Sequence, residues 1–148
     1  MANKKPFWDA ELKGREQFKD LFLCNTIGIA YGTLTMPYDG VLVTKQSHNA
    51  YIFEIKKREF GFGKYPDYFL EESKANSLLN TYENNKQLSG AWYVNILDDT
   101  LLIWDITKID LGETTLEWCN EKTVVESKKV QKPCYHLKPQ DTIWMQKI

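Results

Sequence analysis

Residues 36–56 decide the fold of this chain, because they read as one β-hairpin built around a polar turn. The first half is Met36-Pro37-Tyr38-Asp39-Gly40-Val41-Leu42-Val43-Thr44-Lys45, the turn is Gln46-Ser47-His48-Asn49, and the second half is Ala50-Tyr51-Ile52-Phe53-Glu54-Ile55-Lys56. Apolar, β-prone runs on both sides of a polar tetrapeptide are typical of a hairpin. Folding the segment about its middle therefore places Asp39 across from Glu54 and Lys56.

Two carboxylates and one ammonium group meet in this predicted hairpin. Glu54 and Lys56 are two residues apart, so they share one face of their strand. Glu54 follows the apolar run Tyr51-Ile52-Phe53, where a charge is costly unless it is paired or bound to a metal. Such a set fits a divalent-cation site with a cationic helper, the equipment for cutting a phosphodiester. An ordinary ion pair between Lys56 and either carboxylate is the alternative.

The Glu-x-Lys pattern is weak on its own, because the chain contains it four times. Glu11-Leu12-Lys13 and Glu72-Ser73-Lys74 fall in predicted helices, where residues two apart do not share a face, so we expect solvated surface charges there. Glu126-Ser127-Lys128 has Asp110 sixteen residues before its glutamate (126 − 110), but the intervening segment lacks a strand–turn–strand pattern. The hairpin set is therefore preferred.

Composition places the chain among globular proteins of one domain. Its 148 residues are 43% hydrophobic and 14% aromatic, which is enough for a substantial core. No apolar run approaches the ~20 residues that span a bilayer, and the basic N-terminus lacks the apolar stretch of a signal peptide. Three widely spaced cysteines and two histidines favour a cytoplasmic protein without disulfides or a multi-histidine zinc site. The net charge of −1 counts against a protein that is basic overall, although a local basic patch could still bind nucleic acid.

Local patterns predict the remaining elements. We expect a helix over residues 9–24, a strand over 26–31, a loop over 58–66, a second helix over 67–84, and a second hairpin from 91–97 and 100–106. Near the C-terminus, Thr123-Val124-Val125 and residues 133–137 are expected to form short edge strands or loop.

The sequence Pro37-Tyr38-Asp39, followed after the turn by Phe53-Glu54-Ile55-Lys56, resembles the motif of the PD-(D/E)xK nuclease superfamily. That superfamily includes restriction endonucleases and archaeal-type Holliday junction resolvases. Tyr38 departs from the motif by separating the proline from the aspartate. The predicted order of helix, three strands, helix and strand also fits, over roughly residues 9–106. The resemblance implies an α/β fold with a restriction-endonuclease-like core, in which helices flank a mixed central sheet. It also implies a single nuclease-like domain over 1–148, with a C-terminal extension at 107–148.

The resemblance further implies a Mg²⁺-dependent endonuclease of the PD-(D/E)xK type. Asp39 and Glu54 are the implied ligands of Mg²⁺ or Mn²⁺, with the Ile55 carbonyl as a third, and Lys56 is the implied catalytic lysine that orients or activates the attacking water. Lys13-Gly14-Arg15-Glu16 is similar to a segment in the first helix of resolvase-like members whose glutamate faces the site. Glu16 is therefore a further implied catalytic carboxylate, with an ordinary surface glutamate as the alternative.

Basic and aromatic residues near the hairpin are candidates for binding the substrate. Lys57, Arg58 and Lys64 are expected to contact phosphates and Tyr65 to stack on a base, with a solvated loop as the alternative. Lys74 is an auxiliary candidate, because related nucleases often place a polar residue on the second helix.

The predicted partner is nucleic acid, with DNA ahead of RNA and branched or junction DNA among the substrates considered. A homodimer is expected, because symmetric cleavage of two strands needs two sites. Its interface is placed in part of residues 118–144 or on an edge strand near 91–106. The alternative functions are a non-catalytic nucleic-acid-binding module with a nuclease-like fold, and a structural domain whose charged residues form only an ion-pair network.

Overall fold

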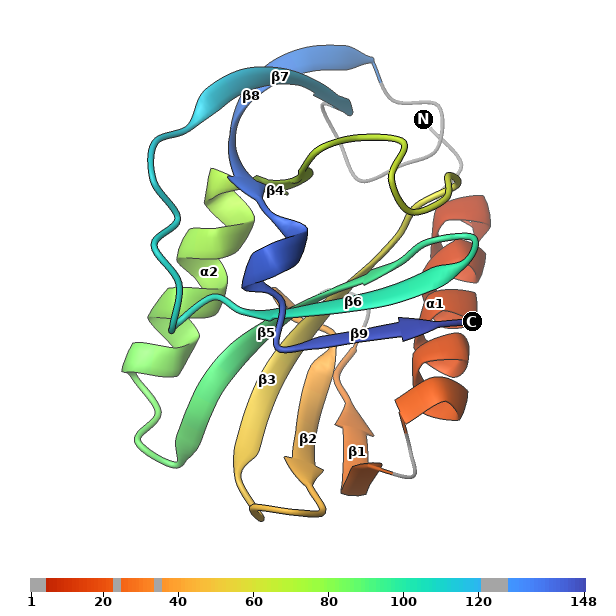
Figure 1. Cartoon of the computed structure of the whole chain (residues 1–148). Helices are drawn as coiled ribbons and strands as arrows, with labels where there is room; N and C mark the ends of the chain where they lie inside the picture. The colour runs from red at the N-terminus through yellow and green to blue at the C-terminus, as the bar shows by residue number, and fades with distance from the viewer. Residues whose placement is uncertain (1–4, 23–24, 34–35, 121–127) are drawn as a thin grey trace.

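The computed structural model describes residues 5–22, 25–33, 36–120 and 128–148, and its centre is a six-stranded sheet between two helices (Figure 1). The strands lie in the order β1 (Thr26–Tyr31), β2 (Gly40–Thr44), β3 (Ala50–Lys57), β5 (Leu88–Ile96), β6 (Thr100–Asp105) and β9 (Trp144–Lys147). Helix α1 (Lys5–Phe22) packs on one face of this sheet and helix α2 (Glu72–Glu83) on the other. None of the described helices is long and apolar enough to cross a membrane.

The strand pairing confirms the predicted fold class. Strands β1, β2 and β3 form an antiparallel meander, whereas β5 pairs with β3 in parallel. A parallel neighbour needs a long crossover, and the segment that contains α2 supplies it. The succession of a helix, three strands, a helix and a parallel strand is consistent with a restriction-endonuclease-like core, with helices flanking a mixed central sheet.

Side chains of β3 alternate between two apolar clusters. Tyr51, Phe53 and Ile55 are buried on the α1 side, where Phe18 and Phe22 of the helix stack at 5.5 Å between ring centroids. Ile52 is buried on the α2 side. Because residues two apart share a face, Glu54 belongs to the α2 face of the strand.

The predicted helix over residues 67–84 is wrong in its first third. Residues 68–71 form strand β4 (Tyr68–Glu71), and the helix occupies only Glu72–Glu83. Tyr68 and Leu70 are buried while Phe69 and Glu71 are partly exposed, which is the period of two of a strand. Asp67, where the predicted helix begins, contacts His136 through Oδ1 and Nδ1 at 3.1 Å.

Strand β4 belongs to a second, three-stranded antiparallel sheet. Its order is β4, β8 (Lys129–Leu137) and β7 (Thr115–Asn120), so residues 133–137 lie in the central strand and their assignment as an edge strand or loop is wrong. A short 3-10 helix, η2 (Pro139–Asp141), leads from β8 towards β9. The other predicted short strand, Thr123-Val124-Val125, lies outside the described residues.

The predicted second hairpin is confirmed as β5 and β6, but neither is an edge strand. Strand β9, from the C-terminal segment, pairs with β6 and completes the main sheet. An edge near residues 91–106 is therefore not available for a dimer, and the outer strands of the six-stranded sheet are β1 and β9.

Candidate functional site

The β2–β3 hairpin places Asp39 opposite Glu54, as the sequence predicted. Gly40 pairs with Phe53, and the Asp39 N–H donates to the Phe53 carbonyl at 2.9 Å. Gly40 suits this turn into the strand because a Cβ there would collide with the Ala30 carbonyl oxygen. The backbone therefore fixes Asp39 immediately before β2, where its side chain is buried.

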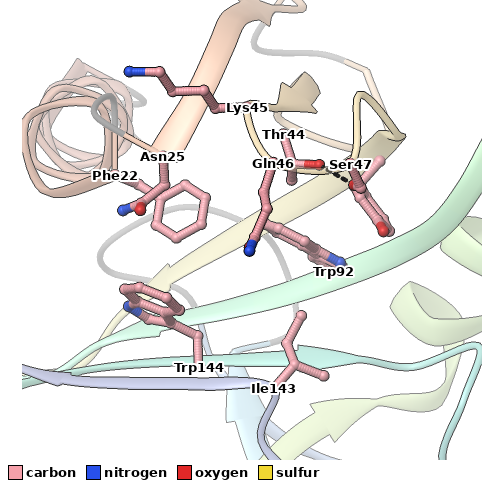
Figure 2. A pocket seen from close by; sticks show the side chains of 10 residues that line it. Phe22, Asn25, Thr44, Lys45, Gln46, Ser47, Trp92, Ile143 and Trp144 are labelled. Atoms are coloured by element: carbon pink, nitrogen blue, oxygen red, sulfur yellow. Dashed lines mark hydrogen bonds between the residues drawn. The ribbon is translucent and has the colours of Figure 1, made fainter.

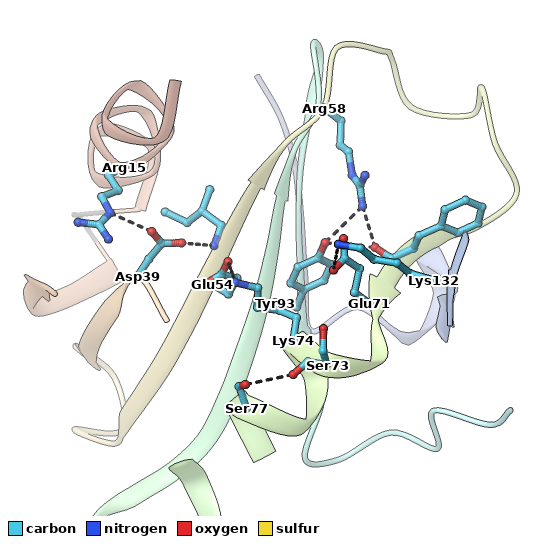
Figure 3. Close-up of polar contacts among 12 residues, drawn as sticks. Arg15, Asp39, Glu54, Arg58, Glu71, Ser73, Lys74, Ser77, Tyr93 and Lys132 are labelled. Carbon is cyan, nitrogen blue, oxygen red and sulfur yellow. Dashed lines mark hydrogen bonds and ion pairs between the residues drawn. The ribbon is translucent and has the colours of Figure 1, made fainter. Parts of the chain in front are cut away.

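Both carboxylate oxygens of Asp39 have protein partners (Figure 3). Oδ1 accepts a hydrogen bond from Arg15 Nε at 2.9 Å, and Oδ2 accepts one from the Ile55 N–H at 2.7 Å. Arg15 Nη1 also donates to the Gly32 carbonyl at 2.7 Å. A buried carboxylate with a guanidinium and an amide donor is compensated in both charge and hydrogen bonding. Ile55 thus contacts Asp39 through its amide, and a ligand role for its carbonyl stays a prediction.

Glu54 is paired with Lys74, for which the sequence indicated both a surface charge of a Glu-x-Lys pair and, through the resemblance, an auxiliary candidate for the site. Its Oε1 lies 3.0 Å from Lys74 Nζ of α2, and its side chain is only 13% exposed. Burial, followed by the nearby Asp39 charge, raises the pKa of Glu54 from 4.5 to about 8, and Lys74 opposes this shift. Lys74 is therefore part of the carboxylate cluster, and not the surface charge that its Glu-x-Lys spacing indicated.

A third carboxyl group, Glu11 of α1, joins this cluster. Burial raises its pKa from 4.5 to about 7, and Asp39 adds to the shift through its charge and a side-chain hydrogen bond. The expectation that Glu11 is a solvated surface charge is wrong. The signal in the sequence was its spacing to Arg15, Phe18 and Phe22, which follows the helical period of one buried face.

Glu16, the carboxylate implied by the resemblance, does not share that face. It is exposed, whereas its neighbour Arg15 is buried against Asp39. One residue along an α-helix turns the side chain by about 100°, which takes Glu16 away from the face that carries Glu11. The structure thus places Glu11 beside Asp39 in the position expected for Glu16.

Lys56 lies on the Glu54 side of β3 without an ion-pair partner among the described residues. Partial burial, and then the charge of Arg58, lower the pKa of Lys56, while Glu71, Glu11 and Glu54 oppose the shift. The carboxylates of Glu54 and Glu11 therefore interact electrostatically with both Lys56 and Lys74, but among the described residues only Lys74 forms an ion pair with Glu54.

The basic residues of the predicted substrate surface separate into two kinds. Arg58 points inward: Nε donates to Asn95 Oδ1 at 3.0 Å, and Nη2 donates to the Phe69 carbonyl at 2.7 Å and to the Tyr93 hydroxyl at 3.3 Å. These bonds join Arg58, the residue that follows β3, to β4 and β5, so the assignment of Arg58 to a phosphate contact is corrected to a structural one.

Lys57, Lys64 and Tyr65 remain on the surface. Lys64 Nζ lies 5.6 Å from the centroid of the Tyr65 ring, and that ring contacts Phe60 edge-on. Their role in binding nucleic acid stays a prediction. The competing Asp110/Glu126/Lys128 set cannot be placed, because Glu126 lies outside the described residues.

The cluster has the donor chemistry of a divalent-cation site but not the arrangement of one. Within the described residues, no group of three His, Cys, Asp or Glu side chains stands ready to hold a metal ion. The carboxylates of Glu11, Asp39 and Glu54 are hard oxygen donors of the kind Mg²⁺ prefers. Arg15 and Lys74 now neutralise two of them, so a cation there requires at least one of these side chains to move.

Neither a protein-family model nor a curated protein sequence matches the chain. Among solved structures, the chain is similar to Hjc, a Holliday junction resolvase from the archaeal hyperthermophile Archaeoglobus fulgidus. The TM-score is 0.48 and the sequence identity 11%, over 82% of this chain and 86% of that chain. The fold assignment itself rests on the strand order and directions described above.

Proposed function

We propose that this protein is a Mg²⁺- or Mn²⁺-dependent endonuclease that hydrolyses phosphodiester bonds in DNA, with branched or junction DNA among its substrates. One observation carries the proposal: the strand register sets Asp39 opposite Glu54 on neighbouring strands, each carboxylate is held by one cationic side chain, and Glu11 joins them from α1. Burial, and then the charge of Asp39, raise the pKa of both Glu11 and Glu54. Three carboxyl groups thus lie close together: Glu11 on α1, Asp39 just before β2, and Glu54 on β3. Their negative charges repel one another when all three are ionised. A bound divalent cation relieves such crowding and favours the ionised carboxylates.

Each residue of the cluster has a chemical role in this proposal. Asp39 and Glu54 would hold the cation, with Glu11 binding it directly or through water. When bound, the cation supplies polarisation of the phosphate and a lowered pKa of bound water. Lys56, free of an ion pair among the described residues, would orient the water and offset charge on the pentavalent phosphorus. Lys74 would leave Glu54 and turn to the substrate phosphate.

A second function is favoured by the two ion pairs in the cluster. Arg15 compensates Asp39 and Lys74 compensates Glu54 without a metal. Such a network also suits a non-catalytic nucleic-acid-binding module, in which these pairs only support the fold. That module would bind DNA through Lys57, Lys64 and Tyr65 with no dependence on Mg²⁺.

Cleavage of a panel of labelled linear, flapped and four-way-junction DNAs, with Mg²⁺, Mn²⁺ or EDTA, separates the two functions. The nuclease predicts metal-dependent products that Asp39→Asn and Glu54→Gln abolish. Lys56→Ala should lower the rate by about 10²-fold or more while calorimetry still detects Mg²⁺ binding, because Lys56 is not a ligand. Lys13→Ala, an exposed lysine of α1, is the control. Tight DNA binding with no cleavage under any metal would support the binding module instead.

We also propose that the active form is a homodimer, because one active site cuts one strand. The outer strand β9 and the residues beside it carry exposed apolar side chains, among them Ile143 and Met145, at 48% and 47% exposure. Light scattering across micromolar concentrations, with and without DNA, tests this assembly. A constant monomer mass would instead favour a nicking role.

A further inference from the structure

A cavity of about 500 Å³ lies at the far end of the β2–β3 hairpin from Asp39 (Figure 2). Its walls come from the end of α1, the hairpin turn, β3, β5 and the start of β9. The volume is within the range of small-molecule binding sites, roughly 300–1,000 Å³. The hairpin turn, Thr44 to Ser47, lines the cavity, whereas Asp39 and Glu54 lie at the open end of the same hairpin, where Gly40 pairs with Phe53. The length of the hairpin therefore separates the cavity from the carboxylate cluster.

Aromatic rings form the apolar walls of this cavity. Trp92 stacks on Tyr51 with ring centroids 4.5 Å apart, and Phe22 meets Trp144 edge-on at 5.5 Å. Phe22 also contacts Trp92 edge-on at 5.6 Å, so the rings support one another. Trp144 is 37% exposed and presents aromatic surface to a ligand. Walls of this kind suit a flat aromatic ring, which gains from stacking and edge contacts.

One polar group in these walls lacks a partner. Trp92 is 4% exposed, and its indole Nε1 has no hydrogen-bond acceptor among the described residues. Buried donors without a partner are rare, because they give up hydrogen bonds to water without a replacement. A ligand with a hydrogen-bond acceptor at its edge would supply that replacement if it reached the indole.

The hairpin turn adds polar groups on the opposite side of the cavity. Figure 2 shows the Gln46 side chain reaching between Phe22 and Trp92, and its amide has no hydrogen bond within the described residues. Lys45 lies at the rim and forms no ion pair with any described side chain. The Thr44–Ser47 hydroxyl contact at 2.6 Å and the His48 N–H bond to the Thr44 carbonyl brace the turn. These contacts fix the backbone of the turn, while the Gln46 amide and the Lys45 ammonium are left to interact with a ligand.

We propose that this cavity binds a nucleotide, with a purine base between the aromatic walls and the phosphate near Lys45. The Gln46 amide offers a donor and an acceptor side by side, which matches the edge of adenine. The Trp92 N–H needs an acceptor, which a base edge also carries. Lys45 supplies a positive charge for the phosphate. The ligand is either a free nucleotide or an unstacked nucleotide of a DNA strand, and both present the same chemistry to the cavity.

Titration calorimetry with AMP, CMP and single-stranded oligo(dA) on the full chain in EDTA tests this site without reference to cleavage. Trp144→Ala should weaken binding by about fivefold or more, since stacking is worth ~1–3 kcal/mol per base. Gln46→Ala should reduce the preference for AMP over CMP by a similar factor, and Lys45→Ala should weaken both by about threefold. Trp118→Ala and Gln131→Ala are matched controls on exposed positions of the other sheet, and should bind as the wild type does.

The outcomes divide cleanly. AMP binding that responds to Trp144→Ala and Gln46→Ala identifies a site for a free nucleotide. Binding of oligo(dA) alone, with the same response, identifies a site for a base within a strand. Absence of binding to either probe at millimolar concentration, or binding that both variants leave unchanged, overturns the proposal. Because Gln46 is exposed and without side-chain partners, its variant remains informative if Trp144→Ala disturbs β9.

Discussion

Arg15 of α1 holds Asp39 at the start of β2 through a 2.9 Å ion pair in which both side chains are less than 10% exposed. This contact joins the first helix to the hairpin and neutralises a carboxylate that the proposed chemistry assigns to a metal ion. The same guanidinium bonds the Gly32 carbonyl and lies 5.4 Å from the centroid of the Tyr31 ring. Arg15 therefore acts as a structural counterion in the metal-free protein.

Replacing this counterion should make folding depend on metal. Arg15→Met leaves Asp39 buried without its cation, which should destabilise the metal-free protein by about 3–5 kcal/mol. If Mg²⁺ binds at Asp39, it should raise the melting temperature of this variant more than that of the wild type. Thermal melts with and without 5–10 mM (roughly saturating) Mg²⁺ measure both effects. Lys13→Met on the exposed face of α1 is the control, and an equal Mg²⁺ response in all three proteins would place the metal elsewhere.

The raised pKa values of Glu11 and Glu54 predict how stability depends on pH. Both groups have higher pKa values in the folded protein, about 7 and about 8, than the ordinary 4.5. Their contribution to the free energy of unfolding is therefore fully present below pH 4.5. It is lost as pH rises through 7 to 8, where both groups become ionised in the folded protein. Melting temperatures in EDTA from pH 5 to 9 should show this loss.

The matched variants for this pH dependence are Glu11→Gln and Glu54→Gln. Each should flatten part of the fall in melting temperature, since an amide does not ionise. Mg²⁺ should bind more tightly as pH rises through the same range, with release of protons. A wild-type profile identical to that of the Glu11→Gln, Glu54→Gln double variant would disprove the raised pKa values.

Glu11 and Glu16 give opposite expectations for cleavage. Glu11→Gln removes a carboxylate that acts on both Asp39 and Glu54, so the cleavage rate should fall by about 10²-fold or more. Glu16→Gln changes an exposed side chain and should keep the rate within about twofold. Single-turnover cleavage in saturating Mg²⁺ compares them directly. A large loss in Glu16→Gln with none in Glu11→Gln would show that α1 docks in another rotation when substrate is bound.

The end of β3 and the loop after it should contact DNA through two of the three predicted basic residues, Lys57 and Lys64. Replacing Lys57 and Lys64 by alanine should weaken DNA binding equally on all sequences. It should also reduce the slope of log K against log salt concentration by about two, one for each phosphate contact that is lost. Arg58→Ala should instead lower the melting temperature, because it breaks three hydrogen bonds from the residue that follows β3 to β4 and β5. Fluorescence anisotropy at several salt concentrations measures the slope. An unchanged slope for the double variant would assign both lysines to the solvated surface.

Local sequence patterns were sufficient to predict the strands whose ends are marked by polar turn residues. The polar turn between two β-prone runs identified β2 and β3, and the same logic identified β5 and β6 around Asp98-Asp99. Because strand register follows from a hairpin, the sequence alone also placed Asp39 opposite Glu54. Lys56 was correctly assigned to the Glu54 side of β3, since neighbouring positions on one face are two residues apart.

The tertiary structure decided which other side chains reach this point. Glu11 and Lys74 both lie in Glu-x-Lys pairs that read as surface charges, although the resemblance also made Lys74 an auxiliary candidate. The packing of α1 and α2 on opposite faces of the sheet turns both side chains towards Asp39 and Glu54. Residues 68–71 become a strand because β8, some sixty positions later in the chain, offers them hydrogen-bonding partners. Helix rotation and long-range pairing depend on contacts between distant segments. The sequence by itself thus determined the hairpin and its two carboxylates, and the packing of the helices and the C-terminal strands determined the rest of the site.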